Sequence, residues 1–375
     1  MKIVLAPDKF KGSLTGLEFC NAVEKGLQQS SVNAEIIKLP LADGGDGTIE
    51  VVNYYLKGKE VSTTVNNPFF KKISATYLYA EKSQTAFIEM AEASGLKLLK
   101  DSEFNCVNST TYGTGELILD ALNKGAKYII LGIGGSATND CGIGMANALG
   151  YRFLDTFDND IFPIGENLSK IVKIDDSQVN PKLKAVSVKI ACDVKNPLYG
   201  KQGAAYVYAK QKGATPKDIV LLDKGLQDFS KVIDNRFNII SQNIVGAGAA
   251  GGMGIGAVVF LNGELQSGIE LIMELAQFNL KIKNADWIIT GEGKLDNQTL
   301  SGKTIQGIFN ASKSKNIKIA AFCGSLELNE TELNSLGITY ADAVVNWAKN
   351  LEDAFRNSSD YLVKMAVQFS KYLKK

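Results

Sequence analysis

Short apolar runs that lead through a polar loop into a helix constrain the fold of this 375-residue chain most. Residues 2–6 and 34–39 are such runs, and a helix with capping-box spacing at Thr15 and Glu18 lies between them. Its apolar stripe consists of Phe19, Cys20, Val23 and Leu27. Strands that alternate with helices form parallel sheets through right-handed crossovers, so this region predicts a parallel sheet.

The pattern changes near Pro68 and returns to strand–helix alternation after about residue 285. Residues 73–80 and 85–90 predict an antiparallel pair of strands, and a long terminal helix is expected at 351–373. We therefore predict an α/β protein of two domains with the active site in the cleft between them. Residues 1–66 and 285–375 would form a discontinuous Rossmann-like parallel-sheet domain, and residues 67–284 an inserted mixed α/β domain.

The stretch of residues 127–149 resembles an anion-binding turn between a strand and a helix. An apolar run ends in a loop from Gly132 to Asp140, and small apolar residues with helical spacing follow. Backbone N–H groups at the start of a helix favour an anion, and glycine lets the backbone approach it. We expect this loop to bind an anion, with Asp140 beside it to hold a metal or take a proton.

The chain contains no histidine and only three arginines. The missing histidine excludes a Ser-His-Asp triad, a Cys-His dyad and His-ligated zinc, so acid–base chemistry must use carboxylates, lysine, tyrosine or water. A bound anion must be held mainly by lysine and by backbone N–H groups.

The bulk properties predict a cytoplasmic protein that binds neither nucleic acid nor a membrane. The net charge is +1 and no long basic run occurs, which disfavours nucleic acid as a partner. The apolar runs fall short of the roughly 18–20 residues that a membrane span needs. Five widely spaced cysteines without a Cys-x-x-Cys pair indicate reduced thiols.

Two glycine clusters fit the dinucleotide-binding fingerprint. Residues 132–137 match G-x-G-x-x-A, with Asp155 near the distance expected of a ribose-binding acid, and residues 246–251 match G-x-G-x-x-G. Tight turns and close helix packing explain such matches equally well in a chain with 36 glycines. A nicotinamide-dependent oxidoreductase of a small hydroxy acid is therefore one alternative function. A non-catalytic binding protein for a small acid is another.

Residues 301–304 end like a phosphate-binding P-loop, but Asn297 stands where that motif requires glycine. Lys303 can still contact a phosphate as a point charge.

Carboxylates follow the predicted strands in several separate loops. Because such loops converge on one edge of a parallel sheet, they indicate Mg²⁺ with phosphate rather than zinc. Phosphoryl transfer depends mostly on positioning and charge neutralisation, which do not require histidine. The residues concerned are Asp8, Asp43, Asp46, Asp140, Asp193, Glu292 and Asp296.

In chain order, these segments resemble the bacterial type I glycerate kinase family. The resemblance covers nearly the whole chain. The chain departs from the family pattern at Lys9, where serine is usual, at Cys141, where glycine is usual, and at Lys294, where arginine is frequent. Before the T-Y-G-T-G-E motif, N-C-V at 105–107 also replaces the usual N-P-L. The matching motifs are D-K-F-K-G-S at 8–13, A-D-G-G-D-G-T at 42–48, E-M-A at 89–91 with A-S-G-L at 93–96, T-Y-G-T-G-E at 111–116, G-I-G-G-S-A-T-N-D at 132–140, C-D-V at 192–194 with N-P-L at 196–198, the glycine cluster at 246–252, and T-G-E-G at 290–293 with L-D at 295–296.

The resemblance implies a kinase that phosphorylates D-glycerate with ATP and Mg²⁺, most often to 2-phosphoglycerate. We expect the protein to be cytoplasmic and either monomeric or homodimeric. The motifs mark the site, and the residue types suggest roles within it. Catalysis is expected from Asp193, Asp43 and Lys11, with Asp193 or Asp43 accepting the hydroxyl proton. Substrate binding is expected from Asp8, Lys11, Thr114, Ser136 and Asn139. ATP binding is expected from Gly132, Gly134, Gly135, Ser136, Gly246, Gly248, Gly291 and Lys303, and Mg²⁺ binding from Asp140, Glu292 and Asp296.

Overall fold

The computed structural model describes residues 1–10, 12–30, 32–43, 47–296 and 303–374. The chain divides into two compact units, which are described separately. Unit 1 comprises Met1–Tyr55 and Gly268–Lys375, and unit 2 comprises Leu56–Ser267.

The predicted domain boundaries, 66/67 and 284/285, differ from the divisions between these units. Strand β3 (Lys59–Asn66) lies in unit 2 because it pairs along its whole length with β4 (Lys72–Ala80). Helix α8 (Gly268–Leu275) lies in unit 1, where it packs against α10 (Lys303–Ser312).

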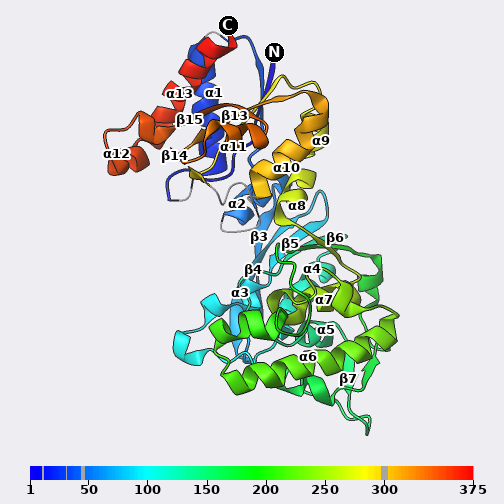
Figure 1. Ribbon diagram of the computed structural model, residues 1–375. Coiled ribbons are helices and arrows are strands. Elements are labelled where there is room, and N and C mark those ends of the chain that lie inside the picture. The colour runs from blue at the N-terminus through cyan, green and yellow to red at the C-terminus, as the bar shows by residue number, and fades with distance from the viewer. Residues whose placement is uncertain (11, 31, 44–46, 297–302, 375) are drawn as a thin grey trace. The chain divides into compact units, whose positions relative to one another are not determined.

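Unit 1 contains a sheet of five parallel strands in the order β15-β13-β11-β1-β2, which confirms the predicted parallel sheet (Figure 1). This order corresponds to the flavodoxin-like variant of a doubly wound sheet, and it reverses between β1 and β11. Ligands of such sheets bind outside the carboxyl ends of the strands at that reversal. The strands are β1 (Lys2–Leu5), β2 (Glu35–Lys38), β11 (Trp287–Thr290), β13 (Lys318–Cys323) and β15 (Ile338–Ala343).

Helix α1 (Gly16–Gln29) begins at the predicted capping box, and its predicted apolar stripe is fully buried. It packs against α13 (Ser358–Leu373), as Figure 1 shows. The approach is close at Gly26, where a Cβ atom would lie 2.4 Å from the carbonyl oxygen of Val363. Glycine is therefore required at this helix–helix contact.

The single terminal helix predicted at 351–373 is wrong, because α12 (Leu351–Arg356) and α13 are separate helices. Asn357 between them has φ −113° and ψ 21°, outside the helical region. Its amide Nδ2 donates to Asp353 Oδ1, and such local side-chain bonds compete with helix continuation.

The remaining elements of unit 1 connect these strands. They are α2 (Thr48–Leu56), whose last residue lies just past the division, α9 (Phe278–Lys281), β12 (Lys294–Leu295), β14 (Ser325–Leu326) and α11 (Glu330–Ser335).

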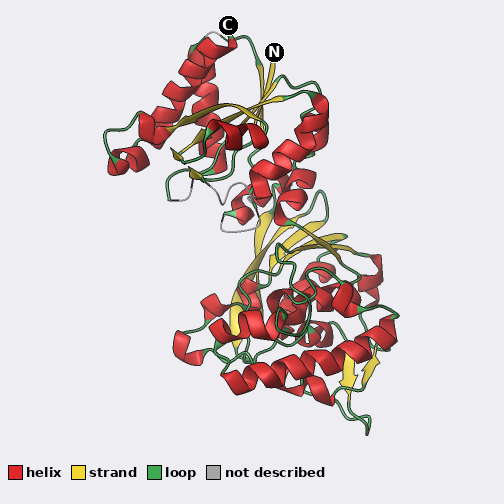
Figure 2. Ribbon diagram, viewed as in Figure 1, coloured by secondary structure: helices red, strands yellow, loops and turns green. Residues whose placement is uncertain are grey.

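Unit 2 contains a six-stranded sheet in the order β10-β9-β6-β5-β4-β3. Figure 2 draws strands in yellow. The four strands from β10 to β5 are parallel, and β4 is antiparallel to both of its neighbours, which confirms the predicted β4–β5 pair. The carboxyl ends of the parallel strands therefore share one edge of the sheet. The parallel strands are β5 (Thr85–Glu89), β6 (Tyr128–Gly132), β9 (Ser187–Ala191) and β10 (Glu264–Gln266).

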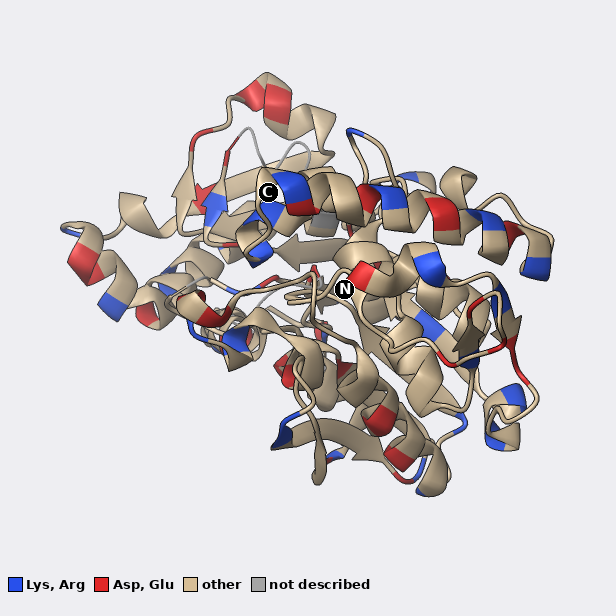
Figure 3. Ribbon diagram, turned by 90° about the horizontal axis from the view of Figure 1, so that it is seen from below, with Lys and Arg blue, Asp and Glu red and all other residues tan. Residues whose placement is uncertain are grey.

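Helices cover this sheet, and a short ribbon of β7 (Arg152–Leu154) and β8 (Lys173–Asp175) lies outside it. Figure 3 shows charged residues of both signs along the helices. Lys224 and Asp228 form one ion pair of opposite charges, one helical turn apart. Within the described ranges, no helix has both the length and the apolarity to cross a membrane. The helices are α3 (Ala91–Ser94), α4 (Tyr112–Asn123), α5 (Ile143–Ala148), α6 (Pro216–Phe237) and α7 (Ala249–Leu261).

Candidate active site

In unit 1, the loops after β1 and β11 meet at the carboxyl edge of the sheet, where the strand order reverses. The backbone N–H of Asp8 donates to the carbonyl oxygen of Gly291 (2.8 Å). The carboxylate of Asp8 accepts hydrogen bonds from Thr304 Oγ1 (2.7 Å) and from the backbone N–H of Lys9 (2.7 Å). Unit 1 thus brings the predicted site residues Asp8 and Gly291 together.

Asp8 also interacts with the exposed carboxylate of Asp43, in the loop after β2. Burial raises the pKa of Asp8, the hydrogen bonds from Thr304 and Lys9 oppose this, and the charge of Asp43 raises it again. Two neighbouring carboxylates attract a cation, so this edge is suited to hold a metal ion or a lysine.

Glu292 and Asp296 follow β11, and both are half-buried. Asp296 forms an ion pair with Lys294 (3.2 Å), which also pairs with Glu327 (2.9 Å). Asp296 therefore already has an ammonium partner. Gly291 is buried, and a Cβ atom there would lie 2.0 Å from the carbonyl oxygen of Phe322, so close packing alone explains its glycine.

Thr304 was not predicted as a site residue, although the P-loop-like signal at 301–304 marked its position. Lys11 lies outside the described residues, as do Asp46 and the side chain of Lys303. Their predicted roles remain predictions.

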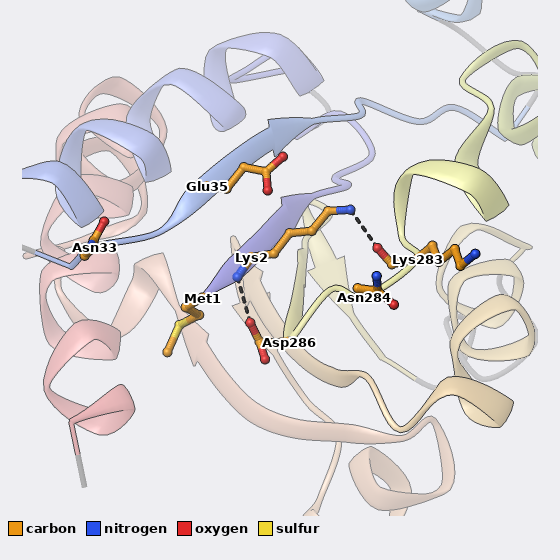
Figure 4. Close-up of a pocket in the computed structure, with 7 residues that line it drawn as sticks. All are labelled: Met1, Lys2, Asn33, Glu35, Lys283, Asn284 and Asp286. Atoms are coloured by element: carbon orange, nitrogen blue, oxygen red, sulfur yellow. Dashed lines mark hydrogen bonds between the residues drawn. The ribbon is translucent and has the colours of Figure 1, made fainter.

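A hollow of about 560 Å³ lies at the amino ends of β1 and β2 (Figure 4). There, Lys2 Nζ donates to the carbonyl oxygen of Lys283 (2.7 Å), and the backbone N–H of Lys2 donates to Asp286 (2.7 Å). This edge of the sheet is opposite to the one that carries Asp8, so the hollow is not the candidate site.

In unit 2, three segments meet at the carboxyl edge: residues 132–142 after β6, 192–198 after β9, and the glycine cluster 246–252. The backbone N–H of Gly248 donates to the carbonyl oxygen of Asn196 (3.0 Å), and that of Cys141 donates to Gly251 (3.0 Å). Asp193 belongs to this assembly because Ala191, two residues before it, pairs with Gly132. Asp193 is half-buried.

The glycines of the 246–252 cluster serve close packing. Gly246 and Gly248 are buried, and a Cβ atom at Gly248 would lie 2.1 Å from the carbonyl oxygen of Pro197. Gly251 has φ +73°, and the regular part of α7 begins only after Gly252. These contacts account for the cluster without ATP, so packing is the better explanation of Gly246 and Gly248.

The anion at the start of α5 is the carboxylate of Asp140, a residue of the same loop, and not a bound ligand. Fully buried Asp140 accepts hydrogen bonds from Thr111 N (2.7 Å), Thr111 Oγ1 (2.8 Å), Gly142 N (3.2 Å) and Gly144 N (3.2 Å). The expectation of an open helix terminus is therefore wrong: Asp140 already occupies these N–H groups. Burial raises the pKa of Asp140, and the four hydrogen bonds oppose the shift. The geometry favours a loop-ordering role over a metal ligand.

Cys141 adopts φ 53°, which explains why glycine suits this position. Its side chain is buried, with Sγ 3.0 Å from the Cβ position of Gly252. Cysteine at position 141, where glycine is usual, therefore adds a side chain to the interior of the loop.

The ligand-accessible part of the loop is Gly134 and Gly135. Both are exposed, and a Cβ atom at Gly134 would have no neighbour within 4 Å. The loop is held from the other side by the 93–96 motif, since Leu96 N donates to the carbonyl oxygen of Gly135 (3.0 Å). Thr114, predicted to bind substrate, is instead buried against Ser94, with the two hydroxyl oxygens 2.8 Å apart.

Lys212 is a site residue that the sequence did not reveal, since nothing distinguishes it from Lys210 nearby. It ends the short 3₁₀ helix η6 (Lys210–Lys212) and is only 3% exposed. Its Nζ donates to Ser136 Oγ (2.7 Å) and to the carbonyl oxygen of Thr138 (2.8 Å). Burial lowers the pKa of Lys212 to about 8, and interactions with Cys106 and Asp140 oppose the shift.

Several polar groups of this loop lack partners. In the part of the chain that the structure describes, Thr138 Oγ1 and both amide atoms of Asn139 are buried without a hydrogen bond. Such groups are costly unless a ligand or water satisfies them. Together with the buried ammonium of Lys212, they fit a small, oxygen-rich anion.

Within the described residues, a magnesium ion fits a site where it would be shared with a ligand. Among the described residues, no group of three or more Cys, Asp and Glu side chains could hold a metal. Mg²⁺ usually binds one or two carboxylates together with substrate phosphates, which does not require such a group. Glu292 and Asp8 supply suitable carboxylates at the edge of unit 1.

Comparison with known proteins gives one consistent result. A family model described as the glycerate kinase family matches residues 3–374. The chain is 41% identical to a glycerate kinase of Halalkalibacterium halodurans, covering 97% of this chain and 96% of the relative. It is 40% identical to a glycerate 2-kinase of Escherichia coli, covering 96% and 94% respectively. A solved structure from Salmonella typhimurium LT2, of a protein assigned as glycerate kinase 2, superposes with a TM-score of 0.88 at 39% identity and covers 100% of this chain and 98% of that one.

Proposed function

Because the chain belongs to the glycerate kinase family, we propose that it transfers the γ-phosphoryl group of ATP to D-glycerate, with Mg²⁺, and releases 2-phosphoglycerate. The observation that carries this proposal is the 40% identity, over 96% of the chain, to a relative named glycerate 2-kinase. The exposed glycines beside the buried polar groups of unit 2 support it, because they suit an anionic ligand.

Asp193 accepts the proton of the glycerate hydroxyl as the hydroxyl oxygen bonds to the γ-phosphorus and the bond to ADP breaks. The residue follows β9, next to the strand that leads into Gly134, at the carboxyl edge of the unit 2 sheet, and this position supports the role. It is half-buried, which favours contact with a ligand over free solvation. Asp43 is the other candidate for this role, but it is exposed.

Glu292, with Asp8, would hold Mg²⁺ together with the phosphates of ATP. When bound, the ion neutralises negative charge on the transferred group. Thr304 fixes the orientation of the Asp8 carboxylate through its hydroxyl donor.

The position of Asp155 does not support the oxidoreductase alternative, which requires this residue as its ribose-binding acid. Asp155 lies in the turn after β7, outside the six-stranded sheet. Its Oδ1 accepts hydrogen bonds from the backbone N–H groups of Phe157 (2.8 Å) and Asn159 (2.9 Å). Asp155 therefore shapes a surface turn.

The test is an assay of purified protein with D-glycerate and Mg-ATP, in which ADP release is coupled to NADH oxidation and the product is identified by ³¹P NMR. We expect ADP and 2-phosphoglycerate in equal amounts. A 3-phosphoglycerate signal would correct the hydroxyl assignment, and glycerate-dependent reduction of NAD without ADP release would overturn the proposal. L-glycerate is the matched control substrate.

A further inference from the structure

We infer that Lys212 is a positioning residue of this site, which fixes the hydroxyl of Ser136 as a hydrogen-bond donor to an oxyanion of the ligand. The inference rests on the proposed function. It assigns a role to a side chain that barely reaches the surface.

The direction of the hydrogen bond follows from the chemistry of the two groups. An ammonium group can only donate, so Ser136 Oγ must accept from Lys212 Nζ. The hydroxyl proton of Ser136 must then point elsewhere. Among the described residues, no acceptor takes it, because Lys212 is the only partner of Ser136 Oγ there. That proton is therefore available to a ligand.

Ser136 lies at the buried end of the accessible part of the loop. Ser136 directly follows the exposed pair Gly134 and Gly135, and it is 5% exposed itself. A hydroxyl that accepts from a buried cation is polarised, so it donates more strongly to an anion. A fixed donor in a site of low dielectric stabilises negative charge without reorganisation during the reaction.

Lys212 also shapes the loop behind this donor. Its second bond goes to the carbonyl oxygen of Thr138, next to the unpartnered side chains of Thr138 and Asn139. The partners of Nζ are thus a hydroxyl and a carbonyl, and Asp140 acts on Nζ without a hydrogen bond to it. A buried ammonium placed in this way is costly for stability, which favours a functional reason for its presence.

The ligand group is a carboxylate or a phosphate oxygen, and these come from glycerate or from ATP respectively. Steady-state kinetics of the full-length protein with each substrate varied in turn separates the two sources. We expect Ser136→Ala to lower kcat/KM for one substrate by about 10- to 100-fold, as for loss of one positioned donor. A rise in the KM for glycerate identifies the carboxylate, and a rise in the KM for ATP identifies a phosphate.

The mechanism is tested by a double-mutant cycle of Ser136→Ala and Lys212→Met. Methionine keeps the length of the lysine stem without its charge. If Lys212 acts through Ser136, the Lys212→Met change costs at least tenfold in wild type but less than threefold in the Ser136→Ala background. Exposed Lys210, two residues away, provides the control Lys210→Met, which should change kcat/KM by less than twofold.

Two results would overturn the inference while the proposed function stands. One is a Ser136→Ala enzyme with wild-type kcat/KM for both substrates. The other is a double variant whose loss of kcat/KM equals the product of the losses in the two single variants, which would mean that Lys212 acts independently of Ser136. Absence of kinase activity in wild type would instead refute the proposed function.

Discussion

The buried ammonium of Lys212 should make the stability of unit 2 depend on pH in a defined window. Its pKa of about 8, against 10.5 for an ordinary lysine, means that the folded protein disfavours the charged form by about 3 kcal/mol. At pH 7 the charge is present and this cost is complete. Because the folded pKa is the lower one, the unfolded chain binds the extra proton between pH 8 and 10.5, so this group raises stability with pH in that range.

Lys212→Met removes the titration and also removes two hydrogen bonds, which are worth about 1 kcal/mol each. At pH 7 the variant should therefore be about 1 kcal/mol more stable than wild type. By pH 10.5 the variant should be about 2 kcal/mol less stable than wild type. Lys212 is then neutral in the folded wild-type protein, so wild type no longer bears the cost of about 3 kcal/mol for a buried charge, whereas the variant gains nothing from the rise in pH. The other titratable groups that face Lys212, Cys106 and Asp140, are present in both proteins.

The assay is urea unfolding from pH 7 to 10.5, followed by hydrogen exchange of the peptide that contains β6. This probe is needed because both tryptophans, Trp287 and Trp347, lie in unit 1 and do not report on unit 2. Lys210→Met is the matched control, with no change expected in the pH dependence. A Lys212→Met variant that is several kcal/mol less stable at pH 7, or a difference that stays constant with pH, would refute the reasoning.

Four further predictions concern single residues. Asp193→Asn should abolish turnover with a Tm close to wild type, and near wild-type turnover would refute its role as the base. Glu292→Gln should raise the Mg²⁺ concentration for half-maximal rate by about tenfold, whereas an unchanged requirement would exclude it as a ligand. Asp140→Asn should lower stability by about 3 kcal/mol in chemical denaturation, because a buried acceptor of four hydrogen bonds is replaced. The Mg²⁺ concentration that the Asp140→Asn variant needs for half-maximal rate should stay unchanged, and a large increase would indicate that Asp140 is a Mg²⁺ ligand after all. Gly26→Ala should lower the unfolding free energy of unit 1 by about 1–3 kcal/mol, since its Cβ meets the backbone of Val363, and a neutral effect would show that α1 and α13 can separate there.

Local signals in the sequence were sufficient for much of the fold. The capping box at Thr15 and Glu18 placed the start of α1, and period-two alternation identified the β4–β5 pair. The break at Asn357 was missed because apolar periodicity continues across it, whereas the cause is a side-chain hydrogen bond to Asp353. The predicted domain boundary at 66/67 differs from the division at 55/56 because β3 pairs with β4, which follows it in the sequence, and so belongs to unit 2.

The candidate site could be located by sequence but not resolved into roles. Motif order identified the strand-end loops, since their carboxylates and glycines are local features. Asp140 shows why roles did not follow: a carboxylate beside glycines suits a metal ion, and it equally suits the chain's own N–H groups. Lys212 could not be found at all, because its contact with Ser136 joins residues 76 positions apart and leaves no periodic signal.

The place of β1 inside the sheet of unit 1 has a consequence for biosynthesis. β1 pairs with β11 on one side, and Ile3 lies opposite Trp287 in that ladder. At the usual bacterial and eukaryotic elongation rates, about 5–20 residues per second, the first strand waits on the order of 15–60 s for this neighbour to be translated. Leu56–Ser267 is contiguous and emerges meanwhile. We therefore expect the nascent N-terminal segment, with the apolar stripe of α1, to be the part of the chain most exposed to chaperones and proteases on the ribosome.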